Sequence, residues 1–248
     1  MCGWIWAEGQ SAYMNPCDAC QETPMANRLR VTFSLGALAS AFVMLAYIWF
    51  GGPDWVHYTF KPLTIVFLMA LVWVAPRGTS SRYRYAIFVG LGFSLAGDIL
   101  LMLPQDLFVP GLLSFLVAHL FYIAAFAPAS LHRLSLACAI PFVIYGVGLN
   151  AWLYPYVGAM RWPVWGYTLA ILTMGYFALR RCMIARHWGA LFAFVGSVLF
   201  VFSDSVIAAC RFRISFSRSG MVIVSTYFAA QFLIALSTFC RNREHAVV

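Results

Sequence analysis

The sequence predicts an all-α protein that crosses a membrane as a bundle of eight helices. Of its 248 residues, 63% are hydrophobic and only 10% are charged, against roughly 25% charged in an average soluble domain. The apolar residues gather into eight runs, and a helix of about 20 residues crosses a hydrocarbon core of roughly 30 Å. Because the runs are continuously apolar and lack the alternation of barrel strands, a β-barrel is not expected.

The first four predicted spans cover residues 31–50, 60–75, 83–103 and 108–127. The first is uninterrupted. The second is short and opens with Lys61, the only lysine of the chain, followed by Pro62. The third contains one carboxylate, Asp98, and the fourth begins near Pro110. All four have the length and apolar character of membrane helices.

The last four predicted spans cover residues 134–153, 162–180, 188–209 and 219–240. The fifth and sixth carry no acidic residue, whereas the seventh contains Asp204. In the eighth, Tyr227 and Gln231 stand four residues apart and share one helical face. Small residues in the third and seventh spans would let helix backbones approach closely: these are Gly90, Gly97, Gly189, Ala193, Gly196 and Ser197.

Basic residues predict the orientation of the bundle. An even number of spans puts both termini on one side, and this side has Arg28, Arg30, Arg77, Arg82, Arg84, Arg133, Arg180, Arg181, Arg186, Arg241 and Arg243. The other side has only Lys61, Arg161, Arg211, Arg213 and Arg218. The positive-inside rule therefore places both termini in the cytoplasm, in what we expect to be a bacterial inner membrane. The net charge of +8 follows from this bias and from anionic lipid surfaces, so nucleic-acid binding is not expected.

We expect three regions: a flexible N-terminal extension at 1–27, a transmembrane domain at 28–243 and a short tail at 244–248. The extension lacks the basic start and apolar core of a signal peptide, and Met25 is a second candidate start. Cys17 and Cys20 form a CxxC within it. A single CxxC without further ligand pairs does not predict a metal site, because zinc sites normally have four ligands.

Asp98 and Asp204 are the only carboxylates that fall inside predicted spans. A charge at membrane depth is unfavourable by kilocalories unless it is paired, hydrated or protonated, so each suggests a functional site. Asp98 lies fourteen residues past Arg84 and Asp204 seventeen past His187, which puts them roughly 21 and 26 Å from the cytoplasmic flank at 1.5 Å per residue. The two are therefore nearly level, and they would meet if the third and seventh spans were neighbours.

Further polar groups accompany the two acids. His119 is the only histidine inside a predicted span, and Tyr122 follows it on the same helical face. Each polar residue alone has a structural interpretation: a buried hydrogen-bonding group, or a boundary anchor in the case of Lys61. Two acids together with a titratable imidazole and several donors favour chemistry over packing.

Five segments, in this order along the chain, resemble the lysoplasmalogenase (YhhN-like) family of integral membrane hydrolases. They are Lys61-Pro62, SLAGDILL at 94–101, AHLFY at 118–122, GSVLFVFSDSVIA at 196–208 and YFAAQFLI at 227–234. The resemblance implies cleavage of the vinyl-ether bond of a lysoplasmalogen, which gives a fatty aldehyde and a glycerophospho-alcohol. No nucleotide, haem or zinc motif occurs in the sequence, so no cofactor and no metal are expected.

The implied chemistry assigns roles to these residues. A vinyl ether hydrolyses through an oxocarbenium ion, which needs a proton donor and a group that stabilises positive charge. Desolvation and mutual repulsion favour a proton on one of two neighbouring carboxyls, so we expect Asp98 and Asp204 to form a catalytic pair, with His119 as a proton relay. The expected substrate-binding residues are Lys61 at the lipid phosphate, and Ser94, Tyr122, Ser203, Tyr227 and Gln231.

Two other interpretations remain open from the residues themselves. Intramembrane acids and histidines also build proton pathways, so Asp98, His119 and Asp204 would suit a proton-coupled transporter or proton relay. Against this, the chain lacks paired Gly/Pro-broken spans in two related halves, which usually indicate a transport site. Alternatively, the acids only lock helices together, and alanine at either position would then unfold the bundle.

Overall fold

A computed structural model describes residues 24–76, 80–127 and 135–239. Over these residues the chain forms helices and no strands, and the predicted all-α membrane bundle is confirmed. The short 3-10 helices are η3 (Leu136–Ala139), η4 (Gly158–Met160) and η5 (Ser237–Phe239). The α-helices are α1 (Pro24–Phe50), α2 (Asp54–Trp73), α3 (Ser81–Met102), α4 (Phe108–Phe126), α5 (Ile140–Val157), α6 (Arg161–Ala185), α7 (Trp188–Phe212) and α8 (Ser219–Leu236).

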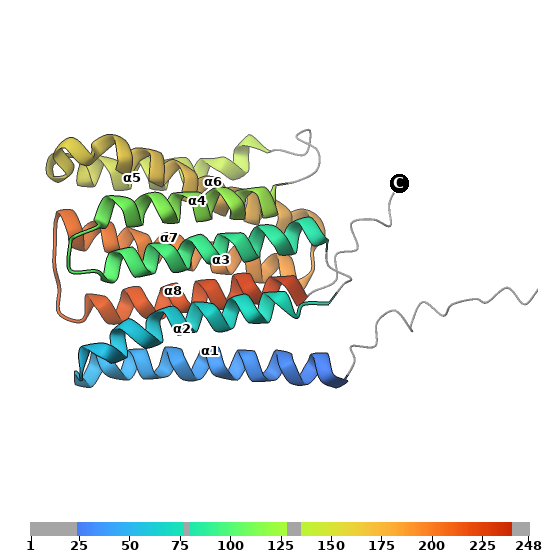
Figure 1. The fold of residues 1–248 in the computed structure, drawn as a ribbon. Coiled ribbons are helices and arrows are strands. Elements are labelled where there is room, and N and C mark those ends of the chain that lie inside the picture. The colour runs from blue at the N-terminus through green and yellow to red at the C-terminus, as the bar shows by residue number, and fades with distance from the viewer. Residues whose placement is uncertain (1–23, 77–79, 128–134, 240–248) are drawn as a thin grey trace, which may run out of the picture.

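Seven helical segments of the described chain are long and apolar enough to cross a membrane. One of them, Ala137–Ala185, contains two α-helices, α5 and α6, joined by η4. The chain reverses within it at Gly158, whose φ of 50° suits a residue without a Cβ, so that α5 and α6 run side by side (Figure 1). Successive helices alternate in direction, and α1 begins at the end of the bundle where α8 finishes (Figure 1). The chain is an integral membrane protein.

Several helices extend beyond the predicted apolar runs. α1 begins at Pro24, inside the expected extension, and α2 begins at Asp54 rather than at residue 60. Backbone hydrogen bonding continues into the polar turns at a membrane surface, which hydropathy does not detect. α5 begins later than predicted, at Ile140, because a proline in its first turn favours a helix start there. Residues 1–23 of the predicted extension, with Cys17 and Cys20, and the tail at 244–248 lie outside the described residues.

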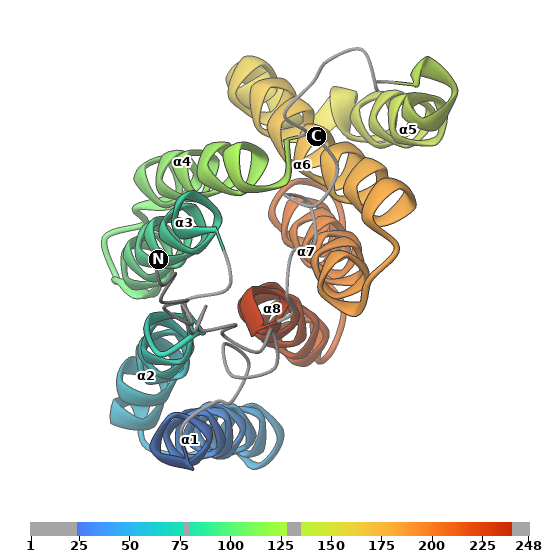
Figure 2. The same ribbon diagram turned by 90° about the vertical axis from the view of Figure 1, so that its right-hand side faces the viewer.

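Six helices enclose the core. In the end-on view, α2, α3, α4, α6, α7 and α8 surround one centre, α1 packs against α2 and α8, and α5 packs against α6 (Figure 2). α3 and α7 lie on opposite sides of this centre, separated by α4 and α6 on one side and by α2 and α8 on the other (Figure 2). The neighbouring arrangement of the third and seventh spans, on which a direct meeting of Asp98 and Asp204 would depend, is therefore not what the bundle adopts.

Glycines set how closely the helices approach. A Cβ on Gly90 would lie 2.4 Å from the Tyr122 ring, and one on Gly97 would lie 2.7 Å from the Phe115 ring. A Cβ on Gly196 of α7 would lie 2.9 Å from the backbone oxygen of Ala230 of α8. Backbone atoms cannot turn aside as side chains do, so the contact at Gly196 fixes the separation of α7 and α8.

We expect Gly196→Ala to destabilise the folded protein by about 1–3 kcal/mol, because the added methyl forces two packed helices apart. The matched control is Gly148→Ala in α5, where a Cβ would meet nothing within 4 Å and alanine is the better helix former. Thermal unfolding of the purified protein in detergent compares the two. Equal melting temperatures for both variants would contradict the close packing of α7 and α8.

Candidate active site within the bundle

Asp98 of α3 is held by two partners from other helices. The ammonium nitrogen of Lys61 on α2 lies 3.1 Å from its Oδ1, and the hydroxyl of Tyr227 on α8 donates to its Oδ2 at 2.7 Å. The Asp98 side chain is only 3% exposed and that of Lys61 14%. An ion pair with a further hydrogen bond is the arrangement that allows a charged carboxylate to stay buried.

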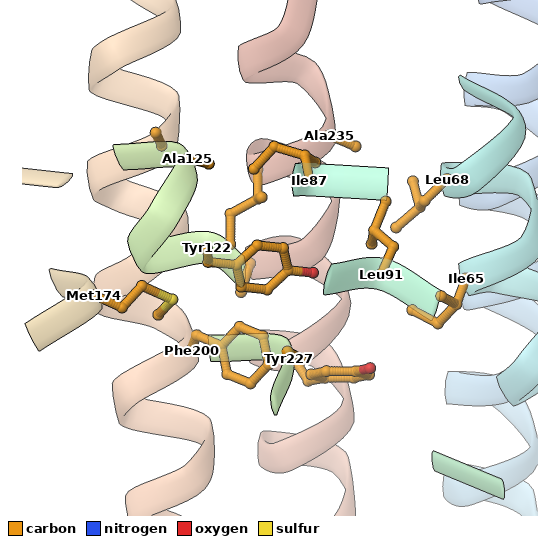
Figure 3. Packing of buried hydrophobic residues seen from close by; sticks show 14 of the residues in the cluster. Ile65, Leu68, Ile87, Leu91, Tyr122, Ala125, Met174, Phe200, Tyr227 and Ala235 are labelled. Atoms are coloured by element: carbon orange, nitrogen blue, oxygen red, sulfur yellow. The ribbon is translucent and has the colours of Figure 1, made fainter. Parts of the chain in front are cut away.

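The hydrogen-bonded network continues from Tyr227 to a second tyrosine. The Gln231 amide donates to the Tyr227 oxygen at 3.2 Å, and the Tyr122 hydroxyl donates to the Gln231 Oε1 at 2.8 Å. Tyr122 and Tyr227 lie among aliphatic side chains such as Leu91 (Figure 3), and Gln231 is fully buried. Ser94 is also fully buried on α3, one turn from Gly90, which contacts the Tyr122 ring. Four of the predicted residues, Lys61, Tyr122, Tyr227 and Gln231, therefore join Asp98 in one network, whereas the Ser94 hydroxyl has no hydrogen-bond partner among the described residues.

The sequence around Lys61 explains how this side chain enters the bundle. Pro62 follows it inside α2, and a proline within a helix removes one backbone hydrogen bond and bends the axis. Figure 1 shows α2 changing direction near its beginning. Lys61 sits at this bend, with its ammonium group directed to Asp98. It is thus ion-paired within the bundle, whereas the sequence placed it at the boundary as a partner for the lipid phosphate.

Asp204 of α7 belongs to a second group of polar residues. The Tyr167 hydroxyl on α6 donates a hydrogen bond to its Oδ2, and the His119 Nε2 on α4 lies 4.0 Å from the same oxygen. The His119 ring is fully buried and edge-on to two aromatic rings, 5.1 Å from the Tyr167 centroid and 4.8 Å from that of Phe200. Neither of its nitrogens has a hydrogen-bond partner among the described residues, so the imidazole is available to Asp204 or to a bound molecule.

An apolar pocket opens beside Asp204. Its walls come from α3, α4, α5, α6 and α7. Phe108, Phe115, Leu153 and Phe212 are among the lining residues, and Asp204 contributes the one carboxyl group among them. Such a space, apolar with a few convergent polar groups, is the usual form of a small-molecule site.

Aromatic rings connect the Asp98 network with the pocket. The Phe115 ring lines the pocket and lies 5.9 Å from the Tyr227 ring, and the Phe200 ring lies 5.4 Å from Tyr227. Within the described part of the chain, no hydrogen bond or ion pair joins Asp98 to Asp204 directly. The two carboxyl groups therefore have different hydrogen-bond partners, although they still interact with each other electrostatically.

Two residues differ from the sequence-based assignment. The Ser203 hydroxyl donates to the backbone oxygen of Ile223 at 3.0 Å, which ties α7 to α8, and we assign it this structural role in place of substrate binding. Tyr167, which holds Asp204, was missed. It stands in an otherwise apolar span, as Tyr122 and Tyr227 do, but only the fold brings its hydroxyl to a carboxylate.

Fold and site together define a polytopic helical membrane protein with buried ionisable groups beside an apolar pocket. The chain belongs to the YhhN family, whose sequence profile matches residues 56–238. It is 32% identical over 190 residues to the membrane protein YhhN of Escherichia coli O157:H7, covering 76% of this chain and 89% of that protein.

Two mammalian relatives carry the name of an enzyme. The chain is 37% identical over 196 residues to lysoplasmalogenase TMEM86A of Bos taurus, covering 75% of this chain and 79% of the relative. It is 34% identical over 202 residues to lysoplasmalogenase TMEM86B of Mus musculus, covering 81% and 83%. No solved structure matches the chain.

Proposed function

We propose that the protein is a membrane hydrolase that cleaves the vinyl-ether bond of lysoplasmalogen-type lysolipids, as the names of its mammalian relatives suggest for them. The observation that carries the proposal is a partly buried carboxyl, Asp204, with a side chain 11% exposed, that lines an apolar pocket inside a membrane bundle. An acid in an apolar slot suits a substrate that combines an acid-labile bond with a hydrocarbon chain. The inner membrane of a bacterium, with both termini in the cytoplasm, is the proposed setting.

Asp204 is the proposed general acid. Its proton is transferred to the outer alkene carbon, and the ether oxygen then shares the positive charge as an oxocarbenium ion. Water adds to the carbon next to this oxygen, and the hemiacetal collapses: R–CH=CH–O–R′ and H₂O give R–CH₂–CHO and HO–R′. The Tyr167 hydroxyl bonds to Oδ2 of Asp204, which fixes the carboxyl while its other oxygen carries the proton. His119, 4.0 Å away, is placed to accept a proton from water and return it to Asp204.

Asp98 is the proposed stabiliser of the developing cation. Its pairing with Lys61 at 3.1 Å favours the ionised form, and a fixed negative charge in a dry site stabilises positive charge more strongly than it does in water. Tyr227, Gln231 and Tyr122 orient the carboxylate through their hydrogen bonds. Asp98 would act on the reacting centre electrostatically, as it does on Asp204, and not through a hydrogen bond to that carboxyl.

We expect the purified protein to release fatty aldehyde from a lysoplasmalogen in detergent, where no ion gradient exists. In D₂O the aldehyde should gain one deuterium at its second carbon, because an acid transfers a solvent-derived proton to that position. In H₂¹⁸O the glycerophospho-alcohol should stay unlabelled, since water attacks the chain carbon and not the glycerol. Mass spectrometry of both products measures this.

A saturated ether lysolipid of the same chain length is the matched control, and it should release no product because it has no alkene to protonate. Aldehyde without deuterium at the second carbon would contradict protonation by an acid. The absence of any aldehyde, together with gradient-dependent proton movement in vesicles, would instead support the proton-relay interpretation.

A further inference from the structure

Four arginines of the described chain stand at the end of the bundle away from Pro24 and Phe239: Arg161, Arg211, Arg213 and Arg218. Three of them belong to the segment between α7 and α8 or its borders, outside every segment that carries the family resemblance. The same end of the bundle contains the outer residues of the Asp204 pocket, on α4, α5, α6 and α7.

Two of these arginines lie at the rim of the pocket. The Arg211 guanidinium lies 4.8 Å from the ring centroid of Phe108, a lining residue. Arg213 lies 4.4 Å from the Trp152 ring, and its neighbours along the chain and in space, Phe212 and Leu153, line the pocket. Both guanidinium groups therefore border the apolar space at its outer end.

Arg213 has no carboxylate partner among the described ion pairs. Its guanidinium packs on the rings of Trp152, at 4.4 Å, and Tyr156, at 4.9 Å, and donates one described hydrogen bond, at 2.6 Å, to the backbone oxygen of Trp152, whereas a guanidinium has five N–H donors. Arg211 is paired with Asp106 at 2.8 Å, but these side chains are 44% and 67% exposed, and such exposed pairs are weak. The rim is thus a cationic site with donors left for an anion, and guanidinium groups suit phosphate well.

The spacing from Asp204 matches a lysolipid. Arg211 follows Asp204 by seven residues on α7, which is about 10 Å along the helix. In a lysophospholipid only the glycerol carbons and their linking oxygens separate the phosphate from the first bond of the chain. A phosphate at the rim would therefore place that bond near Asp204.

We propose that Arg213, with Arg211 beside it, binds the phosphate group of the lysolipid. This rests on the proposed function, and it replaces Lys61, whose ammonium is engaged by Asp98, as the phosphate-binding residue. Arg218 provides the contrast because of its position: it stacks at 4.0 Å over Trp49 of α1, which does not line the pocket.

The test is a binding measurement that does not depend on turnover. The probes are a 1-alkyl lysophosphoethanolamine, which has no cleavable vinyl ether, and the matching 1-alkylglycerol, which has no phosphate. We expect Arg213→Gln and Arg211→Gln each to weaken binding of the phosphate probe about tenfold and to leave alkylglycerol binding unchanged. Arg218→Gln should bind both probes as the original chain does, and Arg213→Lys, which keeps the charge, should retain most of the preference.

Three results would overturn the proposal. An equal loss of binding for Arg218→Gln would indicate a general effect of surface charge, and an equal loss for both probes would indicate altered folding. No loss of binding in any variant would indicate that there is no phosphate subsite. Inhibition of probe binding by inorganic phosphate at the same concentration as the lipid would show a free-anion site and would also overturn it. Aldehyde release, measured separately, tests the proposed hydrolase activity. A chain that binds the phosphate probe through Arg213 but releases no aldehyde would refute the proposed function and leave the subsite standing.

Discussion

Asp204→Asn is expected to lower the rate of aldehyde release by about 10²–10⁴-fold, the usual contribution of a general acid. Asparagine has nearly the same shape and can still accept the hydrogen bond from Tyr167, so the bundle should stay folded. What it lacks is the proton that must reach the alkene carbon. The measurement is the initial rate of aldehyde formation by the purified variant in detergent, with the binding of a saturated lysolipid recorded beside it.

Asp54→Asn is the matched control for Asp204→Asn. Asp54 lies at the exposed start of α2 and accepts a hydrogen bond from the Tyr47 hydroxyl at 3.3 Å, so it too is a carboxyl with a tyrosine partner. Its variant should keep the original rate. Near-normal turnover in Asp204→Asn would exclude this residue as the acid, whereas loss of both binding and thermal stability would point to a structural role.

The second large effect is expected for Asp98→Asn, with a fall in rate of about 10²–10³-fold, the range found when one preorganised electrostatic group is removed. The negative charge that stabilises the oxocarbenium ion is lost, while the asparagine oxygen can still accept from Tyr227. Substrate binding should change little, because the ground state of the vinyl ether is neutral. The rate and the Michaelis constant, measured together, separate these contributions.

The ion pair with Lys61 allows catalysis to be separated from stability. Asp98→Asn leaves the Lys61 ammonium, 14% exposed, without its anion, and one charge of a broken buried pair is destabilising. The double variant Lys61→Met with Asp98→Asn removes both charges and should recover the melting temperature but not the rate. Recovery of the rate in the double variant would show that Asp98 serves only to neutralise Lys61.

The sequence was sufficient to predict the class of fold, because hydropathy shows whether each segment is more stable in water or in lipid. Eight long apolar runs have few stable forms in a bilayer, where each backbone polar group must be satisfied within its own segment. Helix ends were predicted less well, as α1 and α2 show, because surface turns are polar and yet helical. The five short motifs also led to the correct family.

The sequence also marked Asp98, His119 and Asp204 as residues to explain, since ionisable groups are unfavourable in hydrocarbon. Their ion-pair and hydrogen-bond partners could not be predicted from the sequence. That Lys61 pairs with Asp98, and Tyr167 with Asp204, depends on which faces of α2, α3, α6 and α7 turn inward. The rotation of each helix comes from close contacts such as Gly196 against Ala230, which join residues far apart in the chain.

By itself, then, the sequence determined the membrane bundle, its family and the buried acids, because composition and local pattern are sufficient for these. Only the tertiary structure decided that Asp98 and Asp204 bind different partners, and that the pocket reaches Asp204. It also brought Arg211 and Arg213 to the pocket rim. The physical reason is that side-chain contacts between helices depend on packing across the whole bundle, which no single span encodes.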